Sequence, residues 1–528
     1  MVMLNNRKLP AGIQDFEDLR TTGNLYVDKT AYVYRLANTG KHFFLGRPRR
    51  FGKSLFLTTL KQYFLGKKEL FEGLAITGLE KEWIEYPVFH IDMNVEGYLN
   101  LDSLYSALDT NLRRLEAQWG KDPDARSHPA RFISLIERAH AQTGRKVVVL
   151  IDEYDKPLLG PSIDLQNMND DILTVLKGFY GVLKSADAHL RFVFLTGVTK
   201  FAKVSVFSEL NHLTDISLYE DYAGICGISA SELVQNFEPE IATLALKLGK
   251  TFDEMLGLLE KRYDGYHFAE NTEGMYNPYS LLQTFAAGKL KDYWFESGTP
   301  TFLVRMLKDI EFDVKSLEKD VKVLTRTLTD YRVGSSNPVP LLYQSGYLTI
   351  KGYDESLGEY TLGFPNDEVK YGFLYELIPV YMPKMATEFF LGNFIRDLQA
   401  RNIESFMVRL KAFFAGIPYT LNNKNEKHYQ TIFYVLLKLM GQYIAVEQAS
   451  AVGRADVVIT TVDTVYVFEF KLSANGTAED ALKQIDEKGY LIPFTAGNKR
   501  LVKTGAEFST KKRGLSRWLT IQQMPILD

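Results

Sequence analysis

The chain has 528 residues, a length that exceeds what one hydrophobic core usually supports and that predicts two to four domains. Its composition, 46% hydrophobic and 24% charged residues, is ordinary for a globular protein. The formal net charge of −3 excludes a polycation, so any surface for nucleic acid must be local, and the single cysteine, Cys226, excludes an internal disulfide. The N-terminus has no secretion-signal segment and no apolar run nears the roughly 18 residues of a membrane span, so we expect a soluble cytoplasmic protein without a membrane partner.

Residues 1 to about 215 alternate short apolar runs with amphipathic helices. The runs are KHFFLG (41–46), PVFHIDM (87–93), KVVVLIDE (146–153) and RFVFLTG (191–197), and helices such as KSLFLTTLKQYF lie between them. Alternation of strand and helix is typical of a parallel sheet with helices on both faces. We therefore predict an α/β domain over residues 1–215.

The first of these strands leads into a basic loop, RPRRFGKSLFLTTL, with Gly52, Lys53 and Ser54 at the strand-to-helix junction. This is the context of a phosphate-binding P-loop, in which a helix N-terminus favours anions. Lys53 would reach the β- and γ-phosphates of ATP, and the Ser54 hydroxyl would ligate Mg²⁺. The P-loop pattern has a glycine where this chain has Arg47, so a helix N-terminus with a basic surface loop is the alternative.

Two later strands of this domain end in polar residues. KVVVLIDEYD ends in Asp152 and Glu153, and an acid at the carboxyl end of a buried parallel strand lies where such sheets bind ligands. Asp152 would hold Mg²⁺, partly through water, and Glu153 would polarise the attacking water. Thr196 ends the strand RFVFLTG and has a hydroxyl suited to sensing the γ-phosphate. Two acids at a strand end are common alone, but the three features in order predict nucleotide binding and, by extension, hydrolysis.

No arginine finger stands out from the sequence. The candidates are Arg49, Arg50 and Arg262, and each is equally well explained as a structural or solvent-facing residue.

The rest of the chain changes in character twice. Residues 216–400 are mostly helical, as in SASELVQNF (229–237), and residues 300–400 carry no recognisable chemistry. The pattern of residues 401–528 predicts a helix (EKHYQTIFYVLLKLMG) followed by three strands (YIAVEQAS, ADVVITT and VYVFEFKLS). A second helix (AEDALKQIDEKGY) and a fourth strand (RLVKTGAEF) come after them. We therefore predict a helical connector over 216–400 and a C-terminal α/β domain over 401–528.

Charged residues interrupt two of the C-terminal strands. Side chains alternate along a strand, so Glu469 and Lys471 share a face. A turn centred on Val462 and Asp463 would place Asp456 directly opposite Glu469, with Cβ atoms about 4.5–5.5 Å apart. Two carboxylates at that distance repel unless a cation lies between them, and Mg²⁺ or Mn²⁺ suits such hard oxygen ligands. With Lys471 to orient a water or stabilise an oxyanion, the set fits metal-assisted phosphodiester hydrolysis.

The alternative is a salt-bridge ladder of acid, lysine and acid across the hairpin, and the residues alone favour the two interpretations about equally. A register slip of one residue would put Asp456 on the wrong face, so the inference depends on the turn.

Other polar residues cluster in the same zone. Gln484 lies on the following helix with Lys488 on the same face, Glu426 opens the preceding helix and Glu447 lies on the first strand. Such residues are more often at the surface than ligands, and Gln484 is the best catalytic candidate among them. A basic set in the tail suits a polyanion backbone or a solvated rim equally well. Its members are Lys499, Arg500, Lys503, Lys511, Lys512, Arg513 and Arg517.

Several segments closely resemble the bacterial AAA-ATPase-like proteins: YVDKT, FFLGRPRRFGKSLFLTTL, VVVLIDEYDKPL, FLTGVTKFAKVSVFSELNHLTDIS, YDGYHF and YNPYSLL. In that family a nuclease-like domain of the PD-(D/E)XK superfamily usually follows the ATPase domain. GRADVVITTVDTVYVFEFKL, followed by ALKQIDEKGY, looks like that domain. The resemblance implies a P-loop NTPase with a parallel sheet, a helical middle region and a C-terminal α/β restriction-endonuclease-like domain.

The resemblance also implies roles for individual residues. RPRRFGKS is the family's own form of the phosphate loop, and its Walker A and Walker B residues fall on Lys53, Ser54, Asp152 and Glu153. The nuclease triad falls on Asp456, Glu469 and Lys471. Ala455 replaces the proline of the superfamily pattern, a position that does no chemistry. The residues expected to form the nucleotide site are Arg50, Gly52, Lys53, Ser54, Leu55, Asp152 and Thr196.

The sequence thus predicts a protein that binds and hydrolyses ATP and cleaves phosphodiester bonds of nucleic acid with a divalent metal. DNA is the favoured substrate, and defence, repair or mobile-element control the favoured setting. The alternative is a nucleotide-switched regulatory ATPase whose C-terminal domain binds nucleic acid without cutting it. A structural protein with two inert sites fits the retained acids and lysines less well. Related ATPases often form rings or dimers, so a homo-oligomer is also open.

Overall fold

The computed structural model describes most of the chain, and the account that follows concerns these residues. They are 7–159, 165–200, 213–296, 321–328, 337–381, 387–415, 434–441, 444–448, 455–495, 497–509 and 514–523, with Leu307 and Leu317. The described chain up to Lys370 forms one compact unit, and the chain from Tyr371 onward forms a second. The sequence-based boundaries at residues 215 and 400 stay a prediction.

The first unit is built on five parallel strands in the order β2-β3-β4-β1-β5. The predicted parallel sheet is confirmed, and β4 lies between β1 and β3. All six residues of β3 are buried, as expected for a central strand covered on both faces. The strands are β1 (His42–Gly46), β2 (Val88–Asp92), β3 (Val147–Asp152), β4 (Leu190–Gly197) and β5 (Thr214–Asp215).

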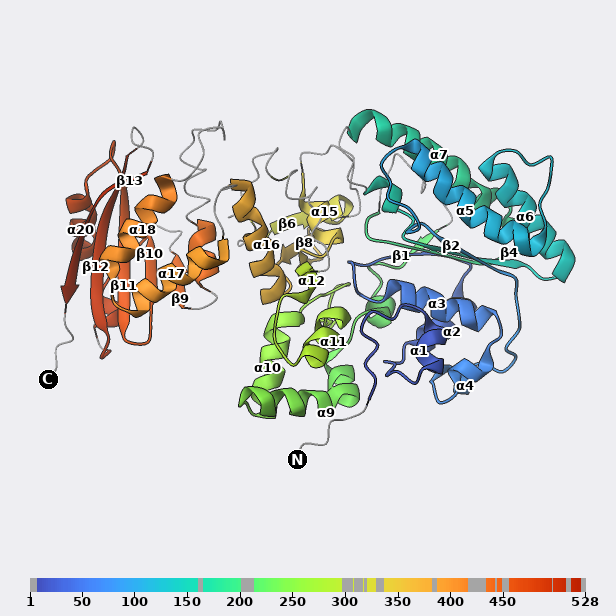
Figure 1. The fold of residues 1–528 in the computed structure, drawn as a ribbon, viewed down its shortest axis with the longest axis horizontal. Coiled ribbons are helices and arrows are strands. Elements are labelled where there is room, and N and C mark those ends of the chain that lie inside the picture. The colour runs from blue at the N-terminus through green and yellow to red at the C-terminus, as the bar shows by residue number, and fades with distance from the viewer. Residues whose placement is uncertain are drawn as a thin grey trace. The chain divides into compact units, whose positions relative to one another are not determined.

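Helices cover both faces of this sheet (Figure 1). One face carries α5 (Leu101–Trp119), α6 (His128–Thr143) and α7 (Leu165–Ser185). The other carries α1 (Phe16–Thr21), α2 (Thr30–Thr39), α3 (Lys53–Phe64) and α4 (Ile76–Leu79). Helix α3 begins at Lys53, as predicted, so the phosphate loop ends at a helix N-terminus. Short 3₁₀ helices span Lys68–Phe71, Lys156–Leu158, Asp187–His189 and Glu220–Ile225.

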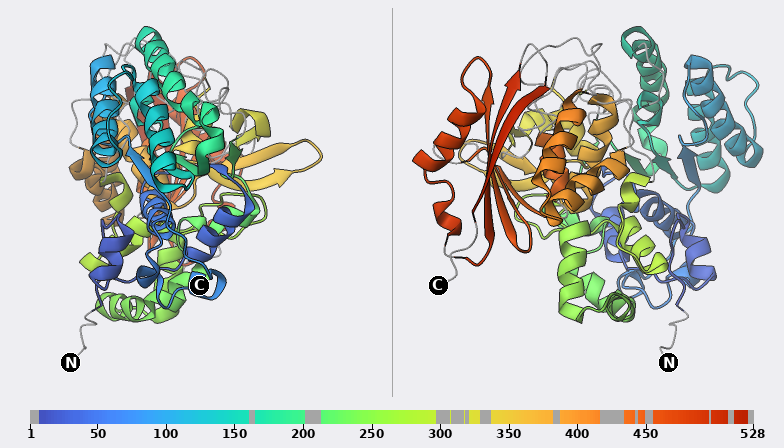
Figure 2. Two further views of the ribbon diagram at one scale, coloured as in Figure 1. Left: turned by 90° about the vertical axis from the view of Figure 1, so that its right-hand side faces the viewer. Right: turned by 60° about the vertical axis from the view of Figure 1, so that its left-hand side comes forward.

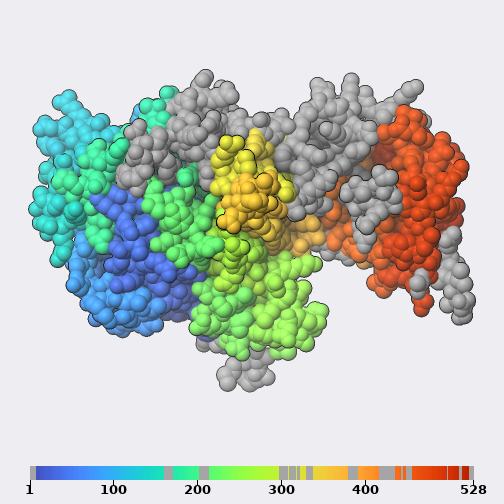
Figure 3. Space-filling model, turned by 180° about the vertical axis from the view of Figure 1, so that it is seen from behind, coloured from blue at the N-terminus to red at the C-terminus, as the bar shows by residue number. Residues whose placement is uncertain are grey.

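The part of the first unit that follows β5, here called the middle segment (residues 216–370), is largely helical. Its α9 and α10 each begin with a capping box, Ser229 with Glu232 and Thr251 with Glu254. It also contains an antiparallel sheet of order β6-β8-β7 that the sequence analysis did not predict. In Figure 3 the green surface of this segment abuts the blue surface of the N-terminal domain.

The elements of the middle segment are α9 (Ala230–Leu248), α10 (Phe252–Tyr263), α11 (Pro278–Ala287), α12 (Tyr293–Glu296), β6 (Val321–Leu324), α14 (Thr325–Leu328), α15 (Val339–Gln344), β7 (Thr349–Asp354) and β8 (Glu359–Gly363). Helix α16 (Asp367–Tyr381) follows them, and the boundary between the two units falls within it, between Lys370 and Tyr371.

The second unit is a sheet of order β13-β12-β11-β10-β9 with helices on both faces (Figure 2). Strands β11 and β12 are parallel, with α20 as their crossover, and the other pairs are antiparallel. The predicted strands and the helix after them are observed, with α18 and β13 in addition. Of the predicted helix EKHYQTIFYVLLKLMG (426–441), the described chain contains 434–441 and is helical over 434–440, and the rest lies outside the described residues. The elements are α17 (Thr387–Gln399), α18 (Ile403–Ala415), β9 (Ala445–Gln448), β10 (Val457–Thr460), β11 (Thr464–Leu472), α20 (Ala478–Glu487), a 3₁₀ helix (Ile492–Phe494), β12 (Arg500–Ser509) and β13 (Gly514–Gln523).

The core of the second unit lies on both sides of β11. On one side Val465, Val467 and Leu482 pack in a cluster that joins the sheet to α20. On the other side the ring of Phe468 lies 5.7 Å from that of Phe406 on α18. None of the helices within the described ranges is long and apolar enough to cross a bilayer.

Candidate active sites

The phosphate loop, residues 47–52, links β1 to α3 at the carboxyl end of the parallel sheet. Arg50 and Gly52 have φ angles of 69° and 93°, and these left-handed residues curl the loop back toward the helix. Lys53 is 4% exposed, and its Nζ donates to the carbonyls of Arg47 and Pro48 at 3.0 and 3.1 Å. The loop therefore wraps around the ammonium group and holds it beside the N-terminus of α3, where anions are favoured.

Arg47 does not lie on the surface, in contrast to the alternative of a basic surface loop. Its side chain is 1% exposed and donates to the carbonyls of Gly46, Ser217 and Tyr222 at 2.8–3.0 Å. Its guanidinium lies 4.2 Å from the centre of the Phe268 ring. Burial lowers the pKa of Arg47. The position where the P-loop pattern has glycine thus holds a side chain that turns away from the loop into the middle segment.

The two acids after β3 occupy a constrained turn. Asp152, the last residue of β3, is buried, and its Oδ1 accepts from the Thr196 hydroxyl at 2.5 Å and from the Glu153 amide at 3.1 Å. Glu153 is half-buried with a φ angle of 52°, uncommon for a residue with a bulky side chain. The Thr196 hydroxyl is directed at Asp152, so in this structure Thr196 orients the carboxylate.

The phosphate loop and these acids lie at the same edge of the sheet. Gly46 is in register with Gly197, and Ile151 with Leu195. One strand therefore separates β1 from β3, which sets the two strand ends about 10 Å apart at the usual spacing. The register therefore brings the candidate phosphate-binding and metal-binding residues to the same part of the sheet edge.

The remaining predicted nucleotide contacts lie on or beside α3. Ser54 and Leu55 are half-buried in its first turn, and the Ser54 hydroxyl has no hydrogen-bond partner among the described residues. Arg50 is exposed, with its guanidinium 5.0 Å from the centre of the Tyr279 ring. Arg262 forms an ion pair with Asp292 at 2.7 Å, which gives this arginine-finger candidate a structural role.

Sequence reasoning missed Asp155, which is fully buried beside these acids. Its Oδ2 accepts from the amides of Val198 and Thr199 at 3.0 and 2.6 Å and from the Thr199 hydroxyl at 2.7 Å. Burial, aided by the charge of Glu153, raises its pKa to about 6. Asp155 therefore ties the turn after β3 to the turn after β4. The third acid of DEYD was the only signal for it in the sequence.

The C-terminal hairpin has the predicted register. Val457 pairs with Phe468 and Thr460 with Val465, so the next pair outward is Asp456 with Glu469. The Thr461 amide donates to the Thr464 carbonyl at 2.8 Å, which closes a two-residue turn at 462–463. The two acids therefore face each other across the hairpin.

Four predicted residues meet at this end of the hairpin. Glu469 is 3% exposed, and its Oε1 accepts from Gln484 Nε2 at 2.5 Å and lies 3.6 Å from Lys471 Nζ. Gln484 Oε1 in turn accepts from Lys471 Nζ. The Asp456 amide lies 3.4 Å from Glu469 Oε2, and Asp456 Oδ2 accepts from the Phe470 amide at 2.9 Å. Gln484 therefore contacts two of the other candidate residues.

The electrostatics of the pair favour a cation. Burial, and then the charge of Asp456, raises the pKa of Glu469 to about 7. Partial desolvation also raises the pKa of Asp456, although the Phe470 amide and Lys471 oppose this. Among the described residues no group of three or more His, Cys, Asp or Glu side chains is arranged to hold a metal ion. Two carboxylates still fit Mg²⁺ or Mn²⁺, because Mg²⁺ usually keeps several water ligands.

The basic set in the tail is largely paired where the structure describes it. Lys503 and Arg517 contact Asp486 and Glu479 on α20, each at 2.5 Å. Lys499 donates to the Thr461 carbonyl at 2.8 Å, and Arg500 Nη1 lies 3.4 Å from Gln522. These partners favour a solvated rim over a free polyanion surface. Lys511, Lys512 and Arg513 lie outside the described residues.

Of the other polar candidates, Lys488 is exposed at the end of α20. Glu447 of β9 pairs with Val458 of β10 in the backbone register, and Glu426 lies outside the described residues.

The fold and the two sites define a protein with an ATPase-type domain and a nuclease-type domain. Residues 10–207 match the family described as a predicted AAA-ATPase, and residues 424–518 match the PD-(D/E)XK nuclease superfamily. The chain is also 36% identical to an "Uncharacterized protein in vnfD 5'region" of Azotobacter chroococcum mcd 1. That alignment spans 522 residues and covers 97% of this chain and 98% of that protein.

The chain belongs to the family of AAA-ATPase-like proteins that carry a C-terminal domain of the PD-(D/E)XK nuclease superfamily. Both domains are of types that are generally hydrolytic and that generally use nucleotide or divalent metal ions.

Proposed function

We propose that the first unit binds and hydrolyses ATP with Mg²⁺ and that the second cleaves phosphodiester bonds of DNA with Mg²⁺ or Mn²⁺. The observation that carries the nuclease part is the Asp456–Glu469 pair across the hairpin, with Lys471 and Gln484 in contact with Glu469. Glu469 is buried, Asp456 opposite it is exposed, and the pKa of each is raised. A buried carboxyl facing a second acid is costly to a fold, which favours a functional reason for keeping it.

In the ATP site, Lys53 would exchange its bonds to the loop carbonyls for bonds to the β- and γ-phosphates. Ser54 and Asp152 would hold Mg²⁺, and the Thr196 hydroxyl keeps the Asp152 carboxylate in place for that role. Glu153, set by its left-handed backbone, would orient the attacking water. Arg50 and Leu55 would border the nucleotide, one before and one after the glycine, lysine and serine of the loop.

In the nuclease site, Asp456 and Glu469 would hold the metal ion, which polarises the phosphate and lowers the pKa of a bound water. Lys471 would place its ammonium beside the developing charge on the phosphate. Gln484 bonds both Glu469 and Lys471, so it fixes the distance between the metal ligand and the cation. These residues would therefore act by positioning the reacting groups and by stabilising charge, which together account for most of the catalysis of phosphoryl transfer.

The test uses full-length protein with labelled linear and circular DNA, in Mg²⁺ or Mn²⁺, with and without ATP. We expect cleavage in the parent protein and none in Glu469→Ala or Lys471→Ala. Lys53→Ala should abolish nucleotide binding, and unchanged affinity would remove the phosphate-loop assignment.

One observation favours a second function, a nucleotide-switched regulatory ATPase whose C-terminal domain binds nucleic acid without cutting it. Glu469, Gln484 and Lys471 form a closed network in which each side chain contacts the other two, so they serve one another as partners. Intact DNA with every metal, together with ATP hydrolysis, would support this second function.

A further inference from the structure

Three side chains of the phosphate loop, those of Arg47, Pro48 and Phe51, are buried against the middle segment. Arg47 lies against Phe268, as described above. Phe51 is 1% exposed, and its ring lies edge-on to those of Tyr266 and Phe268 at 4.7 and 5.2 Å. Gly346 approaches Pro48 so closely that a Cβ on this glycine would lie 2.6 Å from Pro48 Cβ. Three loop side chains therefore pack on elements far away in the sequence.

The loop backbone is held by the same segment. The indole Nε1 of Trp294 donates to the Arg49 carbonyl at 3.2 Å. The amide of Gly227 donates to the Phe51 carbonyl at 3.2 Å. Lys53 binds two further loop carbonyls from the opposite side. When phosphate draws this ammonium away, the contacts to the middle segment are what remains to keep the loop open.

We propose that Phe268 and Trp294 are positioning residues of the ATP site, which hold the phosphate loop in the shape that accepts the phosphates. This inference rests on the proposed ATP binding at Lys53. It also explains why arginine and proline can stand in a loop that usually needs glycine: their side chains are the anchors, and the backbone faces the ligand.

The same tryptophan connects the loop to α16. Its backbone amide donates to Glu368 Oε1 at 2.8 Å, and the Ser280 hydroxyl lies 3.0 and 2.8 Å from the two Glu368 oxygens. Glu368 is 1% exposed and lies in the first turn of α16, the helix that runs into the second unit. Arg49, Trp294 and Glu368 thus form a continuous path from the phosphate loop to α16, and ATP occupancy is coupled to this helix.

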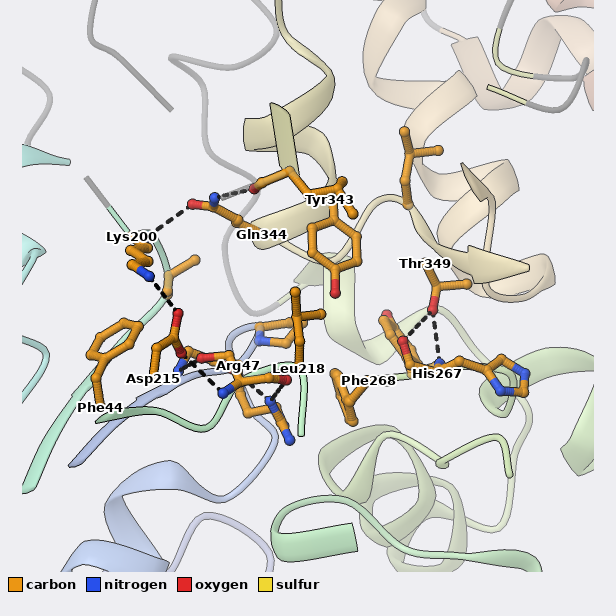
Figure 4. Close-up of a pocket in the computed structure, with 17 residues that line it drawn as sticks. Phe44, Arg47, Lys200, Asp215, Leu218, His267, Phe268, Tyr343, Gln344 and Thr349 are labelled. Atoms are coloured by element: carbon orange, nitrogen blue, oxygen red, sulfur yellow. Dashed lines mark hydrogen bonds and ion pairs between the residues drawn. The ribbon is translucent and has the colours of Figure 1, made fainter. Parts of the chain in front are cut away.

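The contact between the phosphate loop and the middle segment is less tightly packed than a hydrophobic core. A cavity of about 50 Å³ lies between the loop and the middle segment, with Arg47, Phe268, Tyr343 and Gln344 in its lining (Figure 4). Arg47 Nε and the Tyr266 hydroxyl, both from lining residues, are buried without a partner within the described parts of the chain. Voids and unpaired polar atoms lower the stability of a contact, so this one is suited to rearrangement.

The test compares single substitutions in full-length protein. Trp294→Phe keeps the ring and removes the N–H that bonds Arg49, and Phe268→Leu keeps apolar bulk and removes the face under Arg47. Titration with a fluorescent ATP analogue and Mg²⁺ should show affinity about fivefold lower in Trp294→Phe and about tenfold lower in Phe268→Leu. Trp119→Phe is the matched control, because its buried indole Nε1 has no partner in the described structure.

Affinities equal to that of the parent protein in both variants would overturn the proposal. A parent protein that binds no nucleotide would instead refute the ATP site itself. If Phe268→Leu fails to fold, Trp294→Phe decides the matter, because phenylalanine fits the space of tryptophan. Hydrogen exchange of residues 367–377 should change with ATP in the parent and less in Trp294→Phe, and no change in the parent would refute the coupling to α16.

Discussion

Gly505 decides how closely α20 approaches the nuclease site. It lies in β12 in register with Glu469 of β11. A Cβ at this position would lie 2.3 Å from the Ala478 carbonyl oxygen and 2.8 Å from the Leu482 amide nitrogen, both backbone atoms of α20. Ordinary contact begins at 3.4 Å, and 3.4 Å less 2.3 Å leaves a shift of 1.1 Å for α20 in Gly505→Ala.

That shift reaches the catalytic candidates through Gln484. Its Nε2 is 2.5 Å from Glu469 Oε1, so a movement of about 1 Å away from the sheet stretches the bond to about 3.5 Å, the limit of a hydrogen bond. A displacement of this size in a site can cost about 100-fold in rate. We expect cleavage by Gly505→Ala to fall by about that factor while ATP hydrolysis stays unchanged.

The assay is single-turnover cleavage of labelled DNA in Mn²⁺, with ATP hydrolysis measured in the same preparation. Gly514→Ala is the control, because this glycine is in β13 of the same sheet and its added Cβ meets only Phe414 Cβ at 3.5 Å. A folded Gly505→Ala protein that cleaves within twofold of the parent would refute the positioning argument.

Three further outcomes are expected. Asp155→Ala removes the bonds that hold the turn after β4. The maximal rate of ATP hydrolysis should therefore fall at least tenfold, while the affinity for ATP stays within twofold of that of the parent. An equal loss of rate and affinity would contradict a positioning role. Burial raises the pKa of Glu368 to about 8, so the folded protein keeps this carboxyl protonated while the unfolded chain ionises it above about pH 4.5, and its stability falls as the pH rises toward 8. Glu368→Gln should therefore be more stable than the parent at pH 7.5, by at most on the order of 4 kcal/mol, with most of the difference gone at pH 5. Thermal unfolding midpoints of variant and parent that are equal at both pH values would refute a protonated Glu368. EDTA should stop cleavage and excess Mn²⁺ restore it, and cleavage that persists in EDTA would exclude a metal site at Asp456 and Glu469.

The sequence predicted the features that depend on neighbouring residues. Alternation along β11 and a two-residue turn at 462–463 fixed the hairpin register, which placed Asp456 opposite Glu469. The buried apolar run of β3 and the glycine before α3 predicted the strand and the helix start. Each signal is local, so it holds whatever packs above it.

The features that the sequence did not predict depend on tertiary neighbours. Strand β13 lies at the edge of its sheet and mixes polar with apolar residues, so its periodicity is weak. Lys503 of β12 and Arg517 of β13 form ion pairs because α20 places Asp486 and Glu479 beside them. Nothing local distinguishes Asp155 from an exposed acid, or tells which way Arg47 points.

Both sites hold a lysine ammonium on oxygen atoms of the protein, and this sets an order of events. Lys53 is bound by loop carbonyls, which are neutral and which a phosphate outcompetes by charge. Lys471 is bound by Gln484 and lies beside the carboxylate of Glu469. This carboxylate is charged, so it competes with a phosphate for the ammonium more strongly than a neutral carbonyl does. A divalent cation bound at Asp456 and Glu469, as proposed, would weaken the attraction between Glu469 and Lys471 and leave the ammonium available to the substrate. Bound metal should therefore raise the affinity for DNA, and bound DNA should raise the affinity for the metal by the same factor. Lys471→Ala should reduce that factor.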